Sequence, residues 1–169
     1  MATLVNKHSA VVTLPTDTQI QINRDFNVPK ELVYRAWTTP ELVKRWWSAG
    51  HGTVTIADID LQVGGMWRWV TVTETGFEVA FHGVYQQLTP NELIVCTEVY
   101  EAMPDGEALN TITFSDRDGG SSLTLLVQHS CQEHRDGHVN SGMEAGMQSA
   151  LDMLESAALE LLEASTIKA

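Results

Sequence analysis

The chain has 169 residues, of which 43% are hydrophobic and 19% are charged, and its formal net charge is -12. This length suits one domain with a substantial core, and the composition is that of a globular protein. An acidic surface repels nucleic-acid phosphates and anionic lipid head groups, and no apolar run approaches the roughly 20 residues that span a bilayer. The composition therefore argues against nucleic-acid and membrane partners.

The N-terminal residues 1–17 are expected to form a flexible arm ahead of a single domain over residues 18–164. The opening segment "MATLVNKHSAVVTLPTDT" has polar breaks throughout, so it does not have the pattern of a secretory signal peptide. The two cysteines, Cys96 and Cys131, are too few for a disulfide framework. A cytoplasmic location with reduced thiols is therefore expected.

Strand and helix signals follow in order along the chain. The segment "TQIQINRDF" alternates apolar and polar residues up to Phe26, which is the period of a strand. Two short helices come next, because Pro29 and Pro40 stand at favourable first-turn positions. Turn clusters such as "VGG", "TPNE" and "DRDGG" then separate segments rich in β-branched and aromatic residues. These segments predict six further strands, at about residues 52–60, 66–74, 77–88, 91–100, 107–116 and 121–130.

The last segment changes to a helical period. From Gly142 onward, apolar residues recur at spacings of three and four, which predicts one amphipathic helix. Its apolar stripe comprises Met143, Met147, Ala150, Leu151, Leu154, Ala158, Leu161 and Leu162. The opposite face is expected to be solvated and comprises Glu144, Gln148, Asp152, Glu155 and Glu163.

One long helix and about seven antiparallel strands must bury their apolar faces against each other. The simplest solution is an α+β architecture in which a curved antiparallel sheet wraps around the C-terminal helix. Alternation in "TITF" and "LTLLVQH" indicates which side chains face inward. The inward set is Ile112, Phe114, Leu123, Leu125, Val127 and His129.

Five segments together resemble one known family. They are "FNVPKELVYRAWTTPELVKRWW" (26–47), "VGGMWRW" (63–69), "FHGVYQQLTPNELIV" (81–95), "ITFSDRDGGSSLTLLVQHS" (112–130) and "GMEAGMQSALDMLES" (142–156). Their order and spacing resemble the AHSA-type branch of the SRPBCC superfamily, which also includes START lipid carriers and birch-pollen-allergen-like proteins. The resemblance covers roughly residues 19–163. It implies the helix-grip fold, in which an antiparallel sheet grips a long C-terminal helix and two short helices close one end.

The fold that this resemblance implies has a cavity between the sheet and the long helix. We therefore expect the chain to bind or carry a small hydrophobic molecule there, since such sites are lined by apolar, aromatic and adaptable Met side chains. Plain core packing is the alternative explanation for the same residues. The candidate ligand-binding residues are Trp46, Trp47, Trp67, Trp69, Phe81, Tyr85, Phe114, Met143 and Met147.

An enzyme acting on such a ligand in the same cavity is the alternative function. Cyclases and aromatases of the wider superfamily use polar groups of the pocket, and a hydrolase is also conceivable. His82, Glu98 and His129 are the candidates for general acid or base. The chain has no nucleophile elbow, phosphate-binding glycine loop or paired carboxylate motif, so binding is favoured over catalysis.

A protein-interaction role is the third hypothesis. The name of the branch suggests a co-chaperone, but the resemblance is to the C-terminal domain of the eukaryotic activator, which needs a separate N-terminal domain to contact the chaperone. The fold therefore transfers more safely than the activity. A homodimer is plausible as well, because small domains often pair symmetrically.

The segment "QHSCQEHRDGH" raises the question of a metal. His129, Cys131, His134 and His138 have the spacing H-x-C-x-x-H-x-x-x-H, and the last two would share a face of a helix. However, Gly137 interrupts such a helix, and this order of ligands is not a standard structural zinc pattern. The segment is interpreted as a connecting loop, with no metal and no cofactor.

Overall fold

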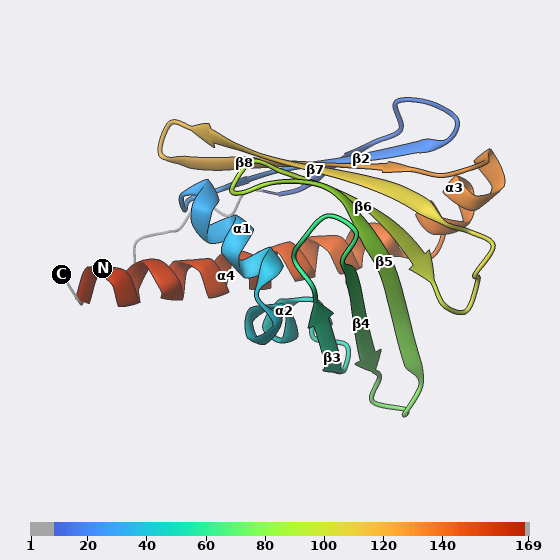
Figure 1. Ribbon diagram of the computed structural model, residues 1–169, viewed down its shortest axis with the longest axis horizontal. Helices are drawn as coiled ribbons and strands as arrows, with labels where there is room; N and C mark the ends of the chain where they lie inside the picture. Colours follow the sequence, from blue (N-terminus) through green and yellow to red (C-terminus); the bar gives the residue numbers. More distant parts are fainter. Residues whose placement is uncertain (1–8, 168–169) are drawn as a thin grey trace.

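The computed structural model of the chain describes residues 9–167 and shows one antiparallel sheet wrapped around a long helix (Figure 1). The strands are β1 (Val11–Thr13), β2 (Gln19–Phe26), β3 (Thr53–Ile59), β4 (Met66–Val72), β5 (Glu78–Thr89), β6 (Leu93–Tyr100), β7 (Ala108–Arg117) and β8 (Gly120–Gln128). The helices are α1 (Lys30–Thr38), α2 (Pro40–Trp46), α3 (Gln132–Val139) and α4 (Met143–Ile167). In the sheet the strands have the order β1-β2-β8-β7-β6-β5-β4-β3. This is the predicted α+β helix-grip fold.

The predicted strands are confirmed to within about two residues at each end. Strand β1 is an addition, because Val11–Thr13 pairs with β2 at the edge of the sheet, with Val12 opposite Ile22. These three residues lie within the predicted arm 1–17, of which residues 1–8 lie outside the described part. The flexibility of that arm, and the domain boundary at residue 18, stay predictions.

Helix α3 replaces the connecting loop that the sequence indicated. It runs over Gln132–Val139 and includes Gly137, although glycine in a helix costs about 1 kcal/mol relative to alanine. Tertiary contacts hold it in place: Arg135 is buried and its Nη1 donates a hydrogen bond of 2.8 Å to the Thr16 carbonyl oxygen. The loop interpretation was therefore wrong, because a contact distant in sequence outweighs the local propensity.

Helix α4 crosses the concave side of the sheet and carries the predicted apolar stripe inward (Figure 1). Leu151, Leu154 and Ala158 are fully buried, and they pack in one core cluster with the inward side chains of the strands. The predicted inward set of β7 and β8, from Ile112 to His129, is buried as expected. Among the described residues, no helix combines the length and apolar character needed to cross a bilayer.

The acidic face of α4 differs from the expectation in one respect. Glu155 was expected to be solvated, but it is only 4% exposed, and its carboxylate accepts a hydrogen bond of 3.3 Å from the Asn27 backbone N–H. The reason is Arg24 on β2, which is 1% exposed and donates to Asp152 at 2.8 Å while its second terminal nitrogen lies 4.0 Å from Glu155. A buried guanidinium needs nearby carboxylates, so α4 turns two of them toward the sheet.

The interior is divided into a packed part and a hollow part. Where β2 and β8 meet α1 and the middle of α4, side chains such as Ile22, Phe26 and Leu154 are completely buried. Toward α3 and the first turns of α4, half-buried Met143 and Met147 stand over β4–β7 instead. The candidate functional site lies in this hollow part.

Candidate functional site

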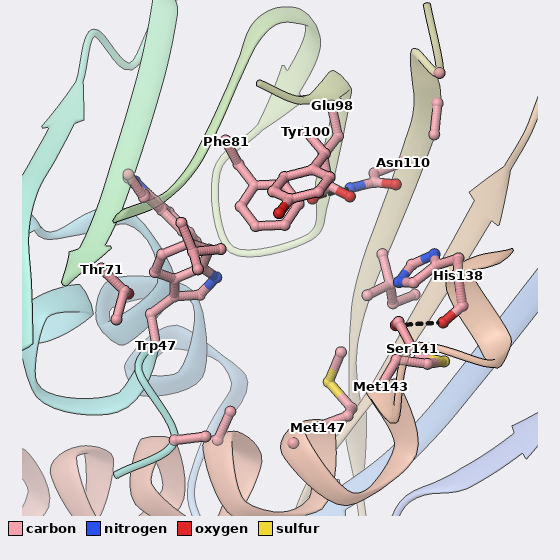
Figure 2. Close-up of a pocket in the computed structure, with 18 of the residues that line it drawn as sticks. Trp47, Thr71, Phe81, Glu98, Tyr100, Asn110, His138, Ser141, Met143 and Met147 are labelled. Atoms are coloured by element: carbon pink, nitrogen blue, oxygen red, sulfur yellow. Dashed lines mark hydrogen bonds between the residues drawn. The ribbon is translucent and has the colours of Figure 1, made fainter. Parts of the chain in front are cut away.

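A cavity of about 820 Å³ lies between the concave face of the sheet and the first turns of α4. Its walls come from the end of α2, strands β4 to β8, α3 and α4. Small-molecule sites measure about 300–1,000 Å³ and are mainly apolar. Figure 2 shows labelled side chains around this space, with Trp47 and Thr71 on one side and Asn110 and His138 on the other. The volume is therefore sufficient for an organic ligand.

Eight of the nine predicted ligand-binding residues line this cavity. They are Trp46, Trp47, Trp67, Trp69, Phe81, Tyr85, Met143 and Met147. Phe114 does not line it: it packs in the other half of the interior against Tyr34, with ring centroids 5.3 Å apart. Phe114 has the correct strand parity but lies too far along β7, a distinction that alternation alone cannot make. The binding role of the other eight stays a prediction.

The aromatic residues form a continuous wall. Ring centroids are 5.1 Å apart for Trp67 and Trp69, 5.6 Å for Trp47 and Trp69, and 5.4 Å for Trp47 and Phe81. The ring of Phe81 stacks on that of Tyr100 at 5.0 Å. Such contacts between aromatic rings are favourable at centroid distances of 4.5–7 Å.

Two local features of the sequence fix this wall. In "WRW" on β4, alternation sends Trp67 and Trp69 to the same face of the sheet. Trp67 then lies across Gly83 on β5 and donates a hydrogen bond of 3.2 Å from Nε1 to the Thr97 carbonyl oxygen. A Cβ at Gly83 would stand 1.8 Å from that oxygen and 2.6 Å from Nε1. Only glycine fits at position 83, because the Thr97 carbonyl oxygen and the Trp67 indole nitrogen lie too close for a side chain.

Glu98 is the acidic residue in the depth of the cavity. It lies on β6, and Asn110 on β7 donates a hydrogen bond of 3.1 Å from Nδ2 to Glu98 Oε2. Burial raises the pKa of the Glu98 carboxyl, and the hydrogen bond from Asn110 opposes this shift. In the sheet register Glu98 stands opposite Ala108, whose small side chain leaves room above it.

Four residues that line the cavity each have a buried polar atom without a hydrogen-bond partner among the described residues. These atoms are Trp69 Nε1, Thr71 Oγ1, Asn110 Oδ1 and His129 Nδ1. An unsatisfied buried polar group costs about 1–3 kcal/mol. A bound molecule with complementary polar groups would remove this cost.

The three candidate catalytic residues lie at two different places in the structure. Glu98 and His129 both line the cavity, but His82 does not. The His82 Nδ1 atom lies 3.0 Å from the carboxylate of Glu101, which also accepts a hydrogen bond of 2.8 Å from Arg68 Nε. Hydrogen bonds from Arg68 and His82 lower the pKa of Glu101 to about 2. His82 thus belongs to a surface ion-pair cluster on the opposite face of the sheet.

The four metal-ligand candidates are not brought to one point. His129 Nε2 lies 3.0 Å from His138 Nδ1, whereas His134 Nδ1 contacts Ser130 Oγ at 3.2 Å. Cys131 stands at the N-cap of α3. Within residues 9–167, no group of three or more His, Cys, Asp or Glu side chains is arranged to hold a metal ion. Burial, followed by neighbouring His138, His134 and Arg135, lowers the pKa of His129 to about 4.

Sequence reasoning missed Asn110 and Thr71 as residues of the site. The same alternation that identified their neighbours could have found them. Thr71 shares its strand parity with Trp67 and Trp69, and Asn110 shares its parity with Ile112. A polar side chain at an inward position of a strand was the available signal.

Comparison with known proteins supports one family. Residues 27–158 match the family described as Activator of Hsp90 ATPase homolog 1-like protein. A crystal structure of a protein from Rhodobacter sphaeroides superposes with a TM-score of 0.82 at 24% identity, covering 87% of this chain and 96% of that one.

Two further solved structures are similar. A protein from Chromobacterium violaceum has 25% identity and a TM-score of 0.75, with 85% of this chain and 98% of that chain covered. The AHSA1-like protein from Aeromonas hydrophila has 20% identity and a TM-score of 0.67, with coverages of 85% and 93%. No functionally curated protein matches this sequence.

Proposed function

This chain belongs to the Activator of Hsp90 ATPase homolog 1-like family, and from that premise we propose that it binds or carries a small, mainly apolar molecule. The bound molecule would occupy the space between the sheet and the first turns of α4. Its apolar body would contact the aromatic wall from Trp47 to Tyr100, and the two methionines of α4 would adapt to its shape.

One observation carries this proposal: a ligand-sized cavity of about 820 Å³ is lined by four residues that have an unsatisfied buried polar atom. A core that exists only for stability is close-packed and has few voids larger than a water molecule. It also leaves few polar groups without partners. The large cavity and the unsatisfied polar groups occur in the same part of the interior, and a bound ligand would account for both.

The experiment is a fluorescence titration with the uncharged dye N-phenyl-naphthylamine. Wild-type protein should bind the dye saturably at one site per chain. In Ala150→Leu the longer side chain would project into the cavity from α4, where Ala150 lines it. We expect the affinity for the dye to fall by about tenfold or more, because the volume it needs is occupied.

Ala164→Leu is the matched control, since it makes the same change on an exposed part of the same helix. Its dye affinity should equal that of the wild type. Equal binding by all three proteins would place the dye elsewhere, and an absence of saturable binding to the wild type would contradict the proposed function.

An enzyme of cyclase, aromatase or hydrolase type is the second candidate. It is favoured by the position of Glu98 and His129, which lie on either side of Ala108 across neighbouring strands. Strands are about 4.8 Å apart, so these two groups could exchange protons with opposite sides of one ligand. A ligand recovered from the protein would be converted by the wild type, and bound but not converted by Glu98→Gln or His129→Gln.

A further inference from the structure

Apart from its four histidines, the lining of the cavity carries charged groups of one sign. The lining contains the carboxyl groups of Glu98 and Glu133, and none of the described lining residues is Lys or Arg. Glu133 is exposed at the mouth, whereas Glu98 is half-buried among the walls of the cavity. Buried carboxyl groups are normally paired with a cation or with several hydrogen-bond donors. Within the described part of the chain, Asn110 is the one hydrogen-bond donor to Glu98.

The groups beside Glu98 include two polar atoms without a hydrogen-bond partner among the described residues. Asn110 is 6% exposed, and because its Nδ2 is directed to Glu98, its Oδ1 is left unsatisfied. His129 is 8% exposed and its Nδ1 is unsatisfied as well. Ala108 lies between them in the sheet, since it pairs with Glu98 and is followed by Leu109, the partner of Gln128. A donor placed above Ala108 would therefore lie beside two acceptor groups, the Glu98 carboxylate and the Asn110 side-chain oxygen.

Aromatic rings complete this corner of the cavity. Tyr100 follows Glu98 by two positions on β6, so both side chains point to the same face of the sheet. The Tyr100 ring stacks on Phe81, and Figure 2 shows these two rings beside Glu98 and Asn110. The face of an aromatic ring carries negative partial charge and attracts a cation within about 6 Å, whereas its edge does not.

We propose that the cavity, in the binding role proposed above, selects apolar molecules that carry a protonated amine, and that the ammonium group lies above Ala108. Its N–H groups donate to the Glu98 carboxylate and to Asn110 Oδ1. The apolar body extends toward Trp47 and Trp69. Any proton that Glu98 holds before binding passes to the solvent, so that the ammonium and the carboxylate form a neutral pair.

The raised pKa of Glu98 agrees with this assignment. Burial without a counter-charge disfavours the carboxylate, and a cation placed beside it reverses that effect. The nearby cationic side chains have other partners. Arg68 is held on the other face by Glu101, and Arg24 is held by Asp152. Arg135, whose charge contributes to the lowered pKa of His129, is held by Asp136 and the Thr16 carbonyl oxygen.

The test is calorimetry at pH 7 with three probes that share an indole body: tryptamine, tryptophol and indoleacetate. They carry an ammonium, a hydroxyl and a carboxylate group, respectively. Charge-assisted hydrogen bonds are about twice as strong as neutral ones, so tryptamine should bind about tenfold tighter than tryptophol, and indoleacetate more weakly than both. This order is measured on the wild type and requires no variant.

Glu98→Gln keeps the shape of the side chain and removes its charge. It should weaken tryptamine binding by about tenfold and leave tryptophol within about twofold. Glu133→Gln is the matched control, because it removes the same charge from an exposed residue at the mouth. It should leave the affinity for tryptamine within about twofold.

Distinct results would separate the two proposals. If tryptamine and tryptophol bind alike and Glu98→Gln changes neither, the amine assignment is wrong while the binding function stands. If Glu98→Gln and Glu133→Gln weaken tryptamine equally, the attraction comes from the net charge of -12 rather than from this corner. If none of the three probes binds to the wild type, the binding function is contradicted together with the assignment.

Discussion

At the scale of single residues, His129 is a buried histidine of the cavity wall whose pKa is lowered. It follows β8, is 8% exposed, lines the cavity and contacts His138 through Nε2. Its pKa of about 4 means that the folded protein holds it as a neutral imidazole near pH 7. One of its nitrogens is thus available to a ligand without a charge, which suits a group that accepts or relays a proton.

The shifted pKa predicts how stability depends on pH. Between the reference value of 6.5 and the folded value of about 4, the unfolded chain binds the proton and the folded chain does not. The free energy of unfolding should therefore fall as the pH falls through this window, by up to about 1 kcal/mol per pH unit from this residue. His129→Gln should flatten that slope in urea denaturation curves measured from pH 7 to pH 4.

His51→Gln serves as the control, since His51 is exposed near the turn after α2. It should leave the slope of stability against pH as in the wild type. A slope in His129→Gln that equals the wild-type slope would mean that His129 does not titrate as its burial implies.

At the scale of elements, sequence patterns predicted the elements that have a repeating pattern or a clear start signal, such as the prolines of α1 and α2, and missed two that depend on distant partners. The strands and α4 contain several periods of alternation or of helical spacing, so tertiary contacts only reinforce them. Strand β1 has 3 residues, and α3 has 8 residues with a glycine among them. Both depend on partners that are distant in the sequence: β1 needs its pairing with β2, and α3 needs the contact between Arg135 and Thr16.

The same limit applied to the candidate site. Parity along β4 identified Trp67 and Trp69 as inward residues, and the structure brings both to the cavity. Parity could not tell that Phe114 lies beyond the cavity, because parity gives the face of a strand and not the position along it. Alternation along β5 separates His82 from Phe81 and Tyr85, but one sequence does not show which of the two faces is the inner one.

The ion pairs of α4 give a prediction that contrasts buried and exposed charges. Arg24→Met should lower the free energy of unfolding by about 3 kcal/mol, because it leaves Asp152 and the buried Glu155 without their cation. Arg45→Met removes an exposed ion pair between α2 and Glu160 of α4, and it should lower the free energy of unfolding by less than about 1 kcal/mol. Urea denaturation of both variants measures the difference; equal losses would show that burial does not govern these pairs.

At the scale of the whole molecule, the hollow part of the interior lowers the free energy of unfolding relative to that of a fully packed core. A cavity of this size forgoes the dispersion contacts and apolar burial that a packed core would provide. Natural folds retain such a departure from close packing mostly where function requires it. The packed part around β2 and the middle of α4 then has to hold the domain together.

This division predicts opposite effects for one substitution at two positions of α4. Ala150→Leu adds a side chain where there is space and should raise the free energy of unfolding by about 1 kcal/mol. Ala158→Leu, two turns later, adds it to a fully buried position in the core cluster and should cost about 1–3 kcal/mol. Thermal denaturation would detect both. Destabilisation by Ala150→Leu of the same size would show that the hollow part is filled.

The division of the interior into a packed part and a hollow part also determines which regions of the molecule can open locally. Regions with few buried apolar contacts open at low free energy, whereas well-packed strands open only in global unfolding. Motion should therefore concentrate in α3, the first turns of α4 and the turn with exposed Met103, which surround the mouth of the cavity. Guest molecules can then be exchanged by local opening at this end, while β2, β8 and the middle of α4 stay closed.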